Sequence, residues 1–386
     1  MRKTRRAREA PCGLDWVRRK SWPRRPPAGS TPVSLVDLFC GCGGLTLGAW
    51  EAARKHQRRL EVKLAVDVCP DALAVYRANF GVSDAVAVQT DAAKLFPGPL
   101  GGPPHRREEV LQERLGQVDL IVAGPPCQGH SDLNNRTRRA DPRNRLYARV
   151  VRAVELLKPA AVLIENVPAV VHDRGRVVAR SLATLGNLGY SVSTAIVEIG
   201  SLGLAQRRKR HVLVGVKHGD FDVAAVFAAA KTPAATLGDY LAGLEDEPEA
   251  ERGIFHTASR MTKANLERVA HLFENDLYDL PDRLRPPCHR DRDHSYVSMY
   301  GRLRWDKPAQ TITSGFGSMG QGRFVHPTRP RTLTPHEAAR IQGLPDFFRF
   351  HAVEKRTVLQ ETIGNAVPPR LSGKCVDEML EACDLL

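Results

Sequence analysis

The chain has 386 residues, 42% of them hydrophobic, which is enough for one large domain with a real core and a smaller domain beside it. It contains no apolar run of about 18 residues, the length that a membrane-spanning helix needs, so we expect no membrane segment. The net charge of +14 at pH 7, from 57 Lys and Arg against 43 Asp and Glu, favours a polyanionic partner, with nucleic acid ahead of a membrane surface.

The chain begins with a strongly basic segment. Residues 2–26 carry ten Lys or Arg against Glu9 and Asp15. The segment lacks the apolar core of a secretory signal, and it lacks the amphipathic repeat and serine richness of an organellar transit peptide. We therefore predict a solvated basic arm that lies along phosphates, with a tail that has no role as the alternative.

From residue 33 the chain alternates between strand and helix patterns. Helical spacing predicts helices at 45–57, 71–79 and 143–158, and a Pro/Gly-rich patch at 97–104 with a charged helix after it predicts a surface insertion. Apolar, β-branched runs predict seven strands, at 33–39, 63–68, 85–89, 118–123, 160–166, 191–199 and 210–216. This alternation is typical of an α/β fold with a parallel or mostly parallel sheet covered on both faces.

After residue 216 the pattern changes. Residues 217–310 are less periodic and mix Ala-rich, acidic and His/Arg-rich pieces, which predicts a separate small domain or a long insertion. Helical signals return at Thr334, because Pro335 and Glu337 then occupy the first and third helical positions. A last amphipathic helix is expected after Pro368-Pro369.

One short stretch carries a candidate nucleophile: Gly124-Pro125-Pro126-Cys127-Gln128-Gly129-His130-Ser131. The glycine and two prolines follow a predicted strand and hold Cys127 beyond its carboxyl end, where parallel sheets usually present ligands. A cysteine thiolate is well suited to attack a weakly electrophilic ring carbon. A buried structural cysteine is the alternative. The eight cysteines form no CxxC pair and no regular framework, so we interpret them as reduced and the protein as intracellular.

A glycine-rich turn follows the first strand, with the sequence Asp37-Leu38-Phe39-Cys40-Gly41-Cys42-Gly43-Gly44-Leu45. Its glycines permit a tight turn and the close approach of a ligand. It is neither GxGxxG nor a P-loop, so a phosphate cradle is not indicated. Asp67 and Asp91 end the next two strands, where one acid suits a ribose hydroxyl pair and the other an adenine amino group. For each, a helix N-cap or turn residue is the alternative.

Further charged groups are expected at the same edge of the sheet. Glu165 ends the fifth strand and should point into the same crevice as Cys127, as a general acid or as a cap for the next helix. Residues 206–210 include four cations and lead into the seventh strand. We expect them on the ligand side of the sheet, with a solvated face as the alternative. The spacing of Cys288, His289, Asp291, Asp293 and His294 matches no zinc pattern, so we expect no metal site.

Together these stretches resemble the DNA cytosine-5 methyltransferase family of prokaryotic type, in its motif order. The resemblance covers about 33–216 and 300–386, with the family's variable target-recognition region between them. The motifs that carry it are 39–44, the region of Asp67, Asp91, 126–128, Glu165-Asn166-Val167, 206–210, 331–346 and 363–369. This chain departs from the family at Cys40 (usually Ala), Asp67 (usually Glu), Val68 (often a larger side chain) and His130 (commonly Phe).

The resemblance implies the Rossmann-like seven-stranded fold of methyltransferases that depend on S-adenosyl-L-methionine (AdoMet), with a smaller target-recognition domain. Residues 1–30 would be a flexible basic N-terminal arm and 31–216 the catalytic, AdoMet-binding domain. Residues 217–310 would form the target-recognition domain. Residues 311–386 would complete the catalytic domain.

The implied reaction moves a methyl group from AdoMet to C5 of a cytosine flipped out of a specific site in double-stranded DNA, through a covalent bond between Cys127 and C6. The implied catalytic residues are Cys127, Glu165, Arg208 and Arg210. The implied cofactor-binding residues are Asp37, Phe39, Gly41, Gly43, Gly44, Leu45, Asp67, Val68, Asp91, Ala92, Pro125, Asn365 and Ala366. The implied DNA-binding residues are Gln128, Ser131 and Gln206.

The resemblance further implies a monomer in the cytoplasm of a bacterium or archaeon, with cognate restriction or phage-defence proteins as possible partners and no membrane association. Two other functions stay open. Methylation of RNA on the same scaffold is opposed by the absence of the Cys-Phe-Thr signature of the family's tRNA-modifying branch. A silent DNA- or cofactor-binding regulator is opposed by the intact set of Cys127, Glu165 and Arg208.

Overall fold

The computed structural model describes residues 13–126, 146–244, 253–290 and 298–385. The chain divides into two compact units. The first, which we call the loop-rich unit, consists of Met1–Trp22, Ile199–Arg208 and Lys231–Asn365. The second, which we call the sheet unit, consists of Pro23–Glu198, Lys209–Ala230 and Ala366–Leu386.

The sheet unit is built on one seven-stranded sheet of order β3-β2-β1-β4-β5-β7-β6. Its strands are β1(Pro32–Leu38), β2(Arg59–Asp67), β3(Ala87–Gln89), β4(Leu120–Ala123), β5(Ala161–Asn166), β6(Ser191–Glu198) and β7(Lys209–Val216). The first five pair in parallel, and β7 is antiparallel to both of its neighbours. The predicted α/β fold, its seven strands and its mostly parallel sheet are therefore confirmed, and β7 is the strand that reverses.

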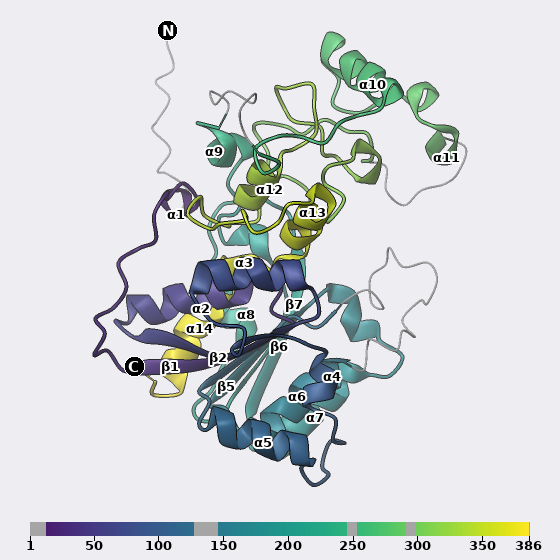
Figure 1. Cartoon of the computed structure of the whole chain (residues 1–386). Helices are drawn as coiled ribbons and strands as arrows, with labels where there is room; N and C mark the ends of the chain where they lie inside the picture. The colour runs from purple at the N-terminus through teal and green to yellow at the C-terminus, as the bar shows by residue number, and fades with distance from the viewer. Residues whose placement is uncertain (1–12, 127–145, 245–252, 291–297, 386) are drawn as a thin grey trace. The chain divides into compact units, whose positions relative to one another are not determined.

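Helices cover both faces of this sheet (Figure 1). One face carries α2(Gly44–Lys55), α3(Pro70–Phe80), α8(Val223–Ala229) and α14(Pro369–Ala382). The other carries α4(Ala92–Leu95), α5(Arg106–Leu115), α6(Leu146–Leu157) and α7(Val177–Asn187), with the 3₁₀ turn η2(Pro168–His172) after β5. Every residue of β4 and β5 is buried, as their continuous apolar runs predict for central strands. Helix α6 ends where Lys158 takes a left-handed conformation before Pro159.

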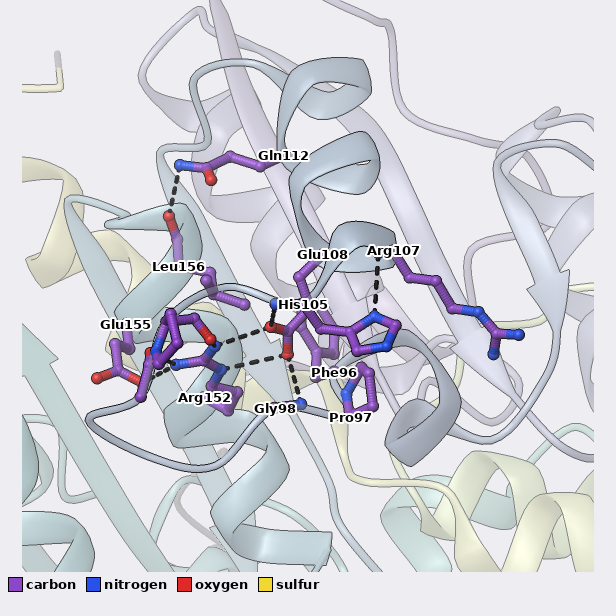
Figure 2. Close-up of polar contacts among 12 residues, drawn as sticks. Phe96, Pro97, Gly98, His105, Arg107, Glu108, Gln112, Arg152, Glu155 and Leu156 are labelled. Carbon is purple, nitrogen blue, oxygen red and sulfur yellow. Dashed lines mark hydrogen bonds and ion pairs between the residues drawn. The ribbon is translucent and has the colours of Figure 1, made fainter.

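The Pro/Gly-rich patch and the helix after it are not simply a surface insertion, and this corrects the prediction. Leu111 and Leu115 of α5 belong to the main core of the sheet unit. Glu108 of the same helix forms an ion pair with Arg152 of α6, with Nη2 and Oε2 2.8 Å apart and side chains 1% and 0% exposed for Arg152 and Glu108 (Figure 2). The charged sequence of α5 concealed this contact because its other acidic and basic side chains face solvent.

This ion pair also fixes the loop before α5. Arg152 donates hydrogen bonds to the main-chain oxygens of Gly102 and Pro103, and Glu108 accepts one from the Gly98 amide. Burial by itself raises the pKa of Glu108, but the hydrogen bonds from Arg152 and from main-chain amides outweigh it and leave this pKa below its ordinary value. The carboxylate is therefore a charged structural group inside the fold.

Replacing Glu108 by Gln should lower the free energy of unfolding by about 3 kcal/mol, because the buried Arg152 loses one of its two carboxylate partners and keeps Glu155, which lies 2.6 Å from Nη1. The depressed pKa of Glu108 means that its contribution is present at neutral pH and is lost as the pH falls below the ordinary value of 4.5. Denaturant unfolding of the wild type and of E108Q should thus converge in acid. The exposed neighbour Glu109 supplies the matched control, since E109Q should leave stability unchanged at both pH values.

The loop-rich unit has short helices. They are α1(Leu14–Val17), α9(Leu237–Leu241), α10(Lys263–Glu274), α11(Pro287–Arg290), α12(Pro335–Ile341) and α13(Arg356–Asn365), with the 3₁₀ turns η3(Ile199–Ser201), η4(Asp282–Leu284) and η5(Met319–Gln321). The predicted start of α12 is confirmed: Thr334 accepts from the Glu337 amide and Glu337 reaches back to the Thr334 amide. In the parts of this unit that the structure describes, strand pairing is limited to isolated bridges.

Part of the predicted basic arm is folded, which corrects the expectation of a flexible segment over residues 1–30. Leu14 and Val17 are buried in a small apolar cluster of the loop-rich unit. The rings of Trp16 and Trp22 pack on Phe347, with centroids 5.4 and 4.5 Å away. The sequence does not predict this packing, because the apolar residues are scattered among arginines and prolines and their partners lie far along the chain.

Candidate active site at the carboxyl ends of the strands

Glu165 and Arg210 form an ion pair at the edge of the sheet where β5 ends. Glu165 Oε1 lies 2.6 Å from Arg210 Nε, and the two side chains are 8% and 11% exposed. Glu165 pairs with Val212 in the sheet register, so Arg210, two residues earlier, projects from the same face of β7. Because β7 is antiparallel to β5, its first residues lie beside the last residues of β5, and this brings the cation to the carboxylate.

The turn that leads to Cys127 begins beside this ion pair. The Gly124 amide donates to Leu38 O of β1, and a Cβ placed on Gly124 would lie 3.7 Å from Glu165 Oε2. Asn166 Nδ2 donates to Pro125 O at 3.2 Å. Cys127, Gln128 and Ser131 themselves lie outside the described residues.

Asn166, for which the sequence predicts no role, anchors the turn. It is 2% exposed, and its side chain both holds the turn at Pro125 and accepts from the Val167 amide. A buried amide at the end of an otherwise apolar strand is the signal that points to such an anchor, because a buried polar side chain needs hydrogen-bond partners.

Gln206 and Arg208 make their contacts inside the loop-rich unit. The Gln206 side chain is fully buried, accepts from the Ile312 amide and donates to Gln342 Oε1 at 2.9 Å. Arg208, 3% exposed, donates to Ile312 O at 2.9 Å. The predicted contact of Gln206 with DNA stays a prediction, and in this structure its amide braces neighbouring segments of its own unit.

The glycine-rich turn after β1 is held by Asp67 at the end of β2. Asp67 accepts from the amides of Gly41, at 2.8 Å, and Cys69, at 2.9 Å. Phe39 takes a left-handed conformation with φ 60° at the start of this turn. The Asp91 carboxylate caps α4 by accepting from the Ala93 amide, so the N-cap alternative considered for it is observed.

The glycines of this turn serve different purposes. A Cβ on Gly43, which has φ 95°, would lie 2.3 Å from the Phe80 ring, and one on Gly44 would lie 2.1 Å from Val367 O. The backbone that approaches Gly44 is therefore the protein's own, just after the buried Ala366. Around Gly41, by contrast, no described atom comes within 4 Å of the added carbon. Among the described residues, the space beside Gly41 is therefore open.

Asp37, the next-to-last residue of β1, is a buried carboxyl group with an unused acceptor. Its Oδ2 accepts from Thr46 Oγ1 at 2.6 Å, and that hydroxyl lies 2.8 Å from Tyr76 OH. Oδ1 has no hydrogen-bond partner among the residues that the structure describes. Burial raises the pKa of Asp37 to about 8, against the opposing effect of the Thr46 hydrogen bond.

These features fit a ligand that carries a hydrogen-bond donor, hydroxyl groups and a flat ring. Asp37 offers a free acceptor, and Asp67 is half-exposed at the end of β2. Val68, the next residue, is 65% exposed and offers an aliphatic surface for a ring, while Ala92 and Leu45 are buried behind the turn and α4. Asn365 ends α13 as an exposed side chain.

Comparison with known proteins identifies the chain's relatives. Residues 33–381 match the family of C-5 cytosine-specific DNA methylases. The chain is 42% identical over 357 residues to the type II methyltransferase M1.BsuMI of Bacillus subtilis (strain 168), covering 92% of this chain and 82% of that relative. It is 30% identical to the type II methylase M.HgiDII of Herpetosiphon aurantiacus, over 90% and 96% of the two chains.

The chain belongs to the C-5 cytosine-specific DNA methylase family. It is a DNA (cytosine-5)-methyltransferase, and the family and the fold imply AdoMet as the methyl donor and DNA as the substrate. Among solved structures, a prophage-encoded E. coli protein described as a DNA modification methyltransferase superimposes with a TM-score of 0.61 at 26% identity, covering 91% of this chain and 99% of that one. The S. pombe Dnmt2 methyltransferase shares the fold, with a TM-score of 0.63 at 16% identity over 91% and 99% of the two chains.

The described residues also allow the predictions about membrane helices, metal sites and cysteines to be examined. No helix among the described residues is long and apolar enough to cross a membrane. Within the same residues, no group of three or more His, Cys, Asp or Glu side chains is arranged to hold a metal, while Asp291, Asp293 and His294 lie outside them. Burial raises the pKa of Cys42 to about 12 and that of Cys40 well above its ordinary value, so both are protonated thiols at neutral pH.

The raised pKa of Asp37 predicts a measurable pH dependence of stability. Between about pH 4 and pH 8 the folded protein keeps a proton on Asp37 that the unfolded chain releases, so stability falls as the pH rises through this range. One such group contributes a slope of at most about 1.4 kcal/mol per pH unit. D37N should flatten the slope of unfolding free energy against pH, measured without cofactor, whereas D306N at an exposed position should not. Parallel slopes for D37N and the wild type would show that Asp37 is ionised in the fold.

Proposed function

We propose that this enzyme methylates C5 of a cytosine that is flipped out of a specific site in duplex DNA, through a covalent bond between Cys127 and C6 of the base. The observation that carries the proposal is the Glu165–Arg210 ion pair beside the turn that leads to Cys127. A nucleophile and an oriented carboxylate at one edge are what addition to a pyrimidine ring needs. A DNA-binding regulator needs neither.

For the cofactor site we propose the residues of the first βα turn and of the next two strand ends. AdoMet, when bound, supplies the methyl group. Asp67 would hold the ribose hydroxyls, Asp91 the adenine amino group, and Val68 would pack on the ring. The remaining proposed contacts come from Asp37, Phe39, Gly41, Gly43, Gly44, Leu45, Ala92, Pro125, Asn365 and Ala366.

In the proposed mechanism the chain's own groups activate the base. The Cys127 thiolate adds to C6, and Glu165, in contact with N3 and the exocyclic amine, favours protonation of N3, which removes the negative charge that would otherwise develop on the ring. This makes C5 electron-rich enough to accept the methyl group. Loss of the C5 proton to water and departure of Cys127 then restore the ring as 5-methylcytosine. Arg208 and Arg210 would hold the base and the nearby phosphate, and Arg210 in addition orients Glu165.

The biological setting that we propose is a type II modification system, since the named relatives are type II methyltransferases. The enzyme would act as a monomer beside a cognate restriction or defence protein. Residues 217–310 would choose the DNA sequence, with Gln128, Ser131 and Gln206 contributing contacts near the flipped base.

The covalent step gives a direct test. Duplex DNA with fluorine at C5 of the target cytosine should trap the enzyme after methyl transfer, because no proton remains at C5 to be removed. We expect a band that survives SDS only with AdoMet present, and transfer of label from AdoMet to duplex DNA rather than to RNA. C127A should abolish both the band and turnover while DNA binding largely persists, since phosphate contacts dominate affinity.

Replacements of Cys40, Cys42 and Cys69 by Ala are the controls. The first two are buried thiols with raised pKa, and none of the three should be needed for the trapped band. A band that survives in C127A, or full turnover without this thiol, would refute the assignment of the nucleophile.

The ion pair gives a second prediction. R210M should lower kcat on the order of 10²-fold, because Glu165 loses the group that orients it, while AdoMet affinity measured by calorimetry stays unchanged. R210K should recover part of the rate, since it restores the charge without the planar fork. The exposed neighbour Lys209 supplies the control, since K209M should leave kcat close to wild type. A wild-type kcat in R210M would show that Arg210 is not needed for catalysis.

A further inference from the structure

A stack of arginines and aromatic rings lies in the loop-rich unit near the end of α10. The Arg302 guanidinium carbon lies 4.3 Å from the centroid of the Phe273 ring and 5.0 Å from that of Tyr278. The Arg304 guanidinium carbon lies 3.9 Å from the same Tyr278 centroid. Tyr278 therefore contacts two cations, and such contacts stabilise by roughly 0.5–2 kcal/mol each.

Two arginines of this cluster use their hydrogen-bond donors within the protein. Arg302 donates from Nε to Pro327 O at 2.7 Å and pairs with Asp276 at 3.1 Å, and its side chain is only 11% exposed. Arg323 donates to Tyr278 O at 2.7 Å, to Arg302 O, and to Asp279. Both residues are thus structural, because they fix the backbone on which Tyr278 is mounted.

Arg304 differs from its two neighbours. It is exposed, and its guanidinium makes no hydrogen bond or ion pair with any residue in the described ranges, where its interaction is the stack on Tyr278. Arginine carries five N–H donors in a planar fork. Stacking restricts the side chain, and its donors have no acceptor among the described residues, so they are available to an external ligand.

We propose that Arg304, held by Tyr278, is a DNA-contacting residue of this methyltransferase and donates two hydrogen bonds to a pair of acceptor atoms on the duplex. That pair is either O6 and N7 of a guanine in the major groove or two oxygens of a phosphate, since both match the guanidinium fork. The inference rests on the proposed role of residues 217–310 in choosing the DNA sequence. DNA is the partner because the substrate is a polyanion and Arg302 and Arg323, the other cations of the cluster, are already neutralised or bonded within the protein.

The test compares R304A with the wild type on a duplex that contains the methylated site. We expect Kd and KM for DNA to rise about 10-fold, with kcat and AdoMet affinity unchanged and thermal stability lowered by no more than the loss of one exposed contact between a cation and a ring. Y278L keeps the charge of Arg304 but removes the ring that holds it, so it should also raise the Kd for DNA. R304K should not restore it fully, because an ammonium lacks the fork.

The two sources of the acceptor pair give different readouts. If Arg304 contacts a phosphate, R304A should lose affinity equally on all sequences, and the slope of log K against log salt should fall by about 0.9. If it reads a guanine, the slope should stay constant and the preference for one base pair of the site should relax. Either result supports the proposal.

The matched control is R283A, which removes an exposed arginine of the same unit whose side chain makes no ring contact or hydrogen bond with any described residue. It should leave the site preference and kcat/KM close to wild type. The proposal fails if R304A matches the wild type in Kd, KM, salt slope and site preference. That outcome would leave methyl transfer to duplex DNA intact, whereas failure of the proposed function would appear as no transfer by the wild type.

Discussion

The reversal of β7 is the constraint on which the candidate site depends. In a fully parallel sheet the residues before β7 would lie at the opposite edge from Glu165, and Arg210 would have no carboxylate to meet. Antiparallel pairing with β5 instead places the beginning of β7 beside the end of β5, and the 2.6 Å ion pair follows from the register. The same geometry puts the pair beside Gly124, where the turn to Cys127 begins. Strand direction here decides which side chains can act together.

The C-terminal segment completes the sheet unit through close backbone contact. Val367 O approaches Gly44, and Pro369 O and Ser372 Oγ approach Gly48, at positions where a Cβ would lie about 2 Å from each oxygen. Ser372 Oγ also donates to Leu45 O at 2.9 Å. Helix α14 can pack on α2 in this way only because both glycines lack a side chain. The glycine-rich turn is therefore shaped from one side by residues more than 300 positions later in the chain.

The titratable side chains discussed above fall into two kinds. Glu108 with Arg152, and Glu337 with Arg331, have their hydrogen-bonding atoms engaged within the protein, and these pairs hold loops and helix starts in place. Asp37 keeps an oxygen without a partner among the described residues, and Arg304 keeps its fork of donors. A satisfied group needs no ligand. The buried oxygen of Asp37 without a partner carries a cost that a ligand can remove, and the exposed fork of Arg304 is accessible to one. This distinction separates structural groups from candidates for cofactor and DNA contact.

The sequence by itself determined the seven strands, the capping box at Thr334 and the glycine-rich turn, because apolar periodicity, capping and turn chemistry are local properties of the chain. Through the order of its motifs it also indicated the family. Only the tertiary structure decided that Arg210 meets Glu165, that Gln206 is buried in a network with Gln342, and that α5 is tied to the core by Arg152. It likewise decided that Trp16 and Trp22 pack on Phe347 rather than extend into solvent. Each of these contacts joins residues tens to hundreds of positions apart, and side-chain identity states what a residue can bind but not which distant partner the fold brings to it.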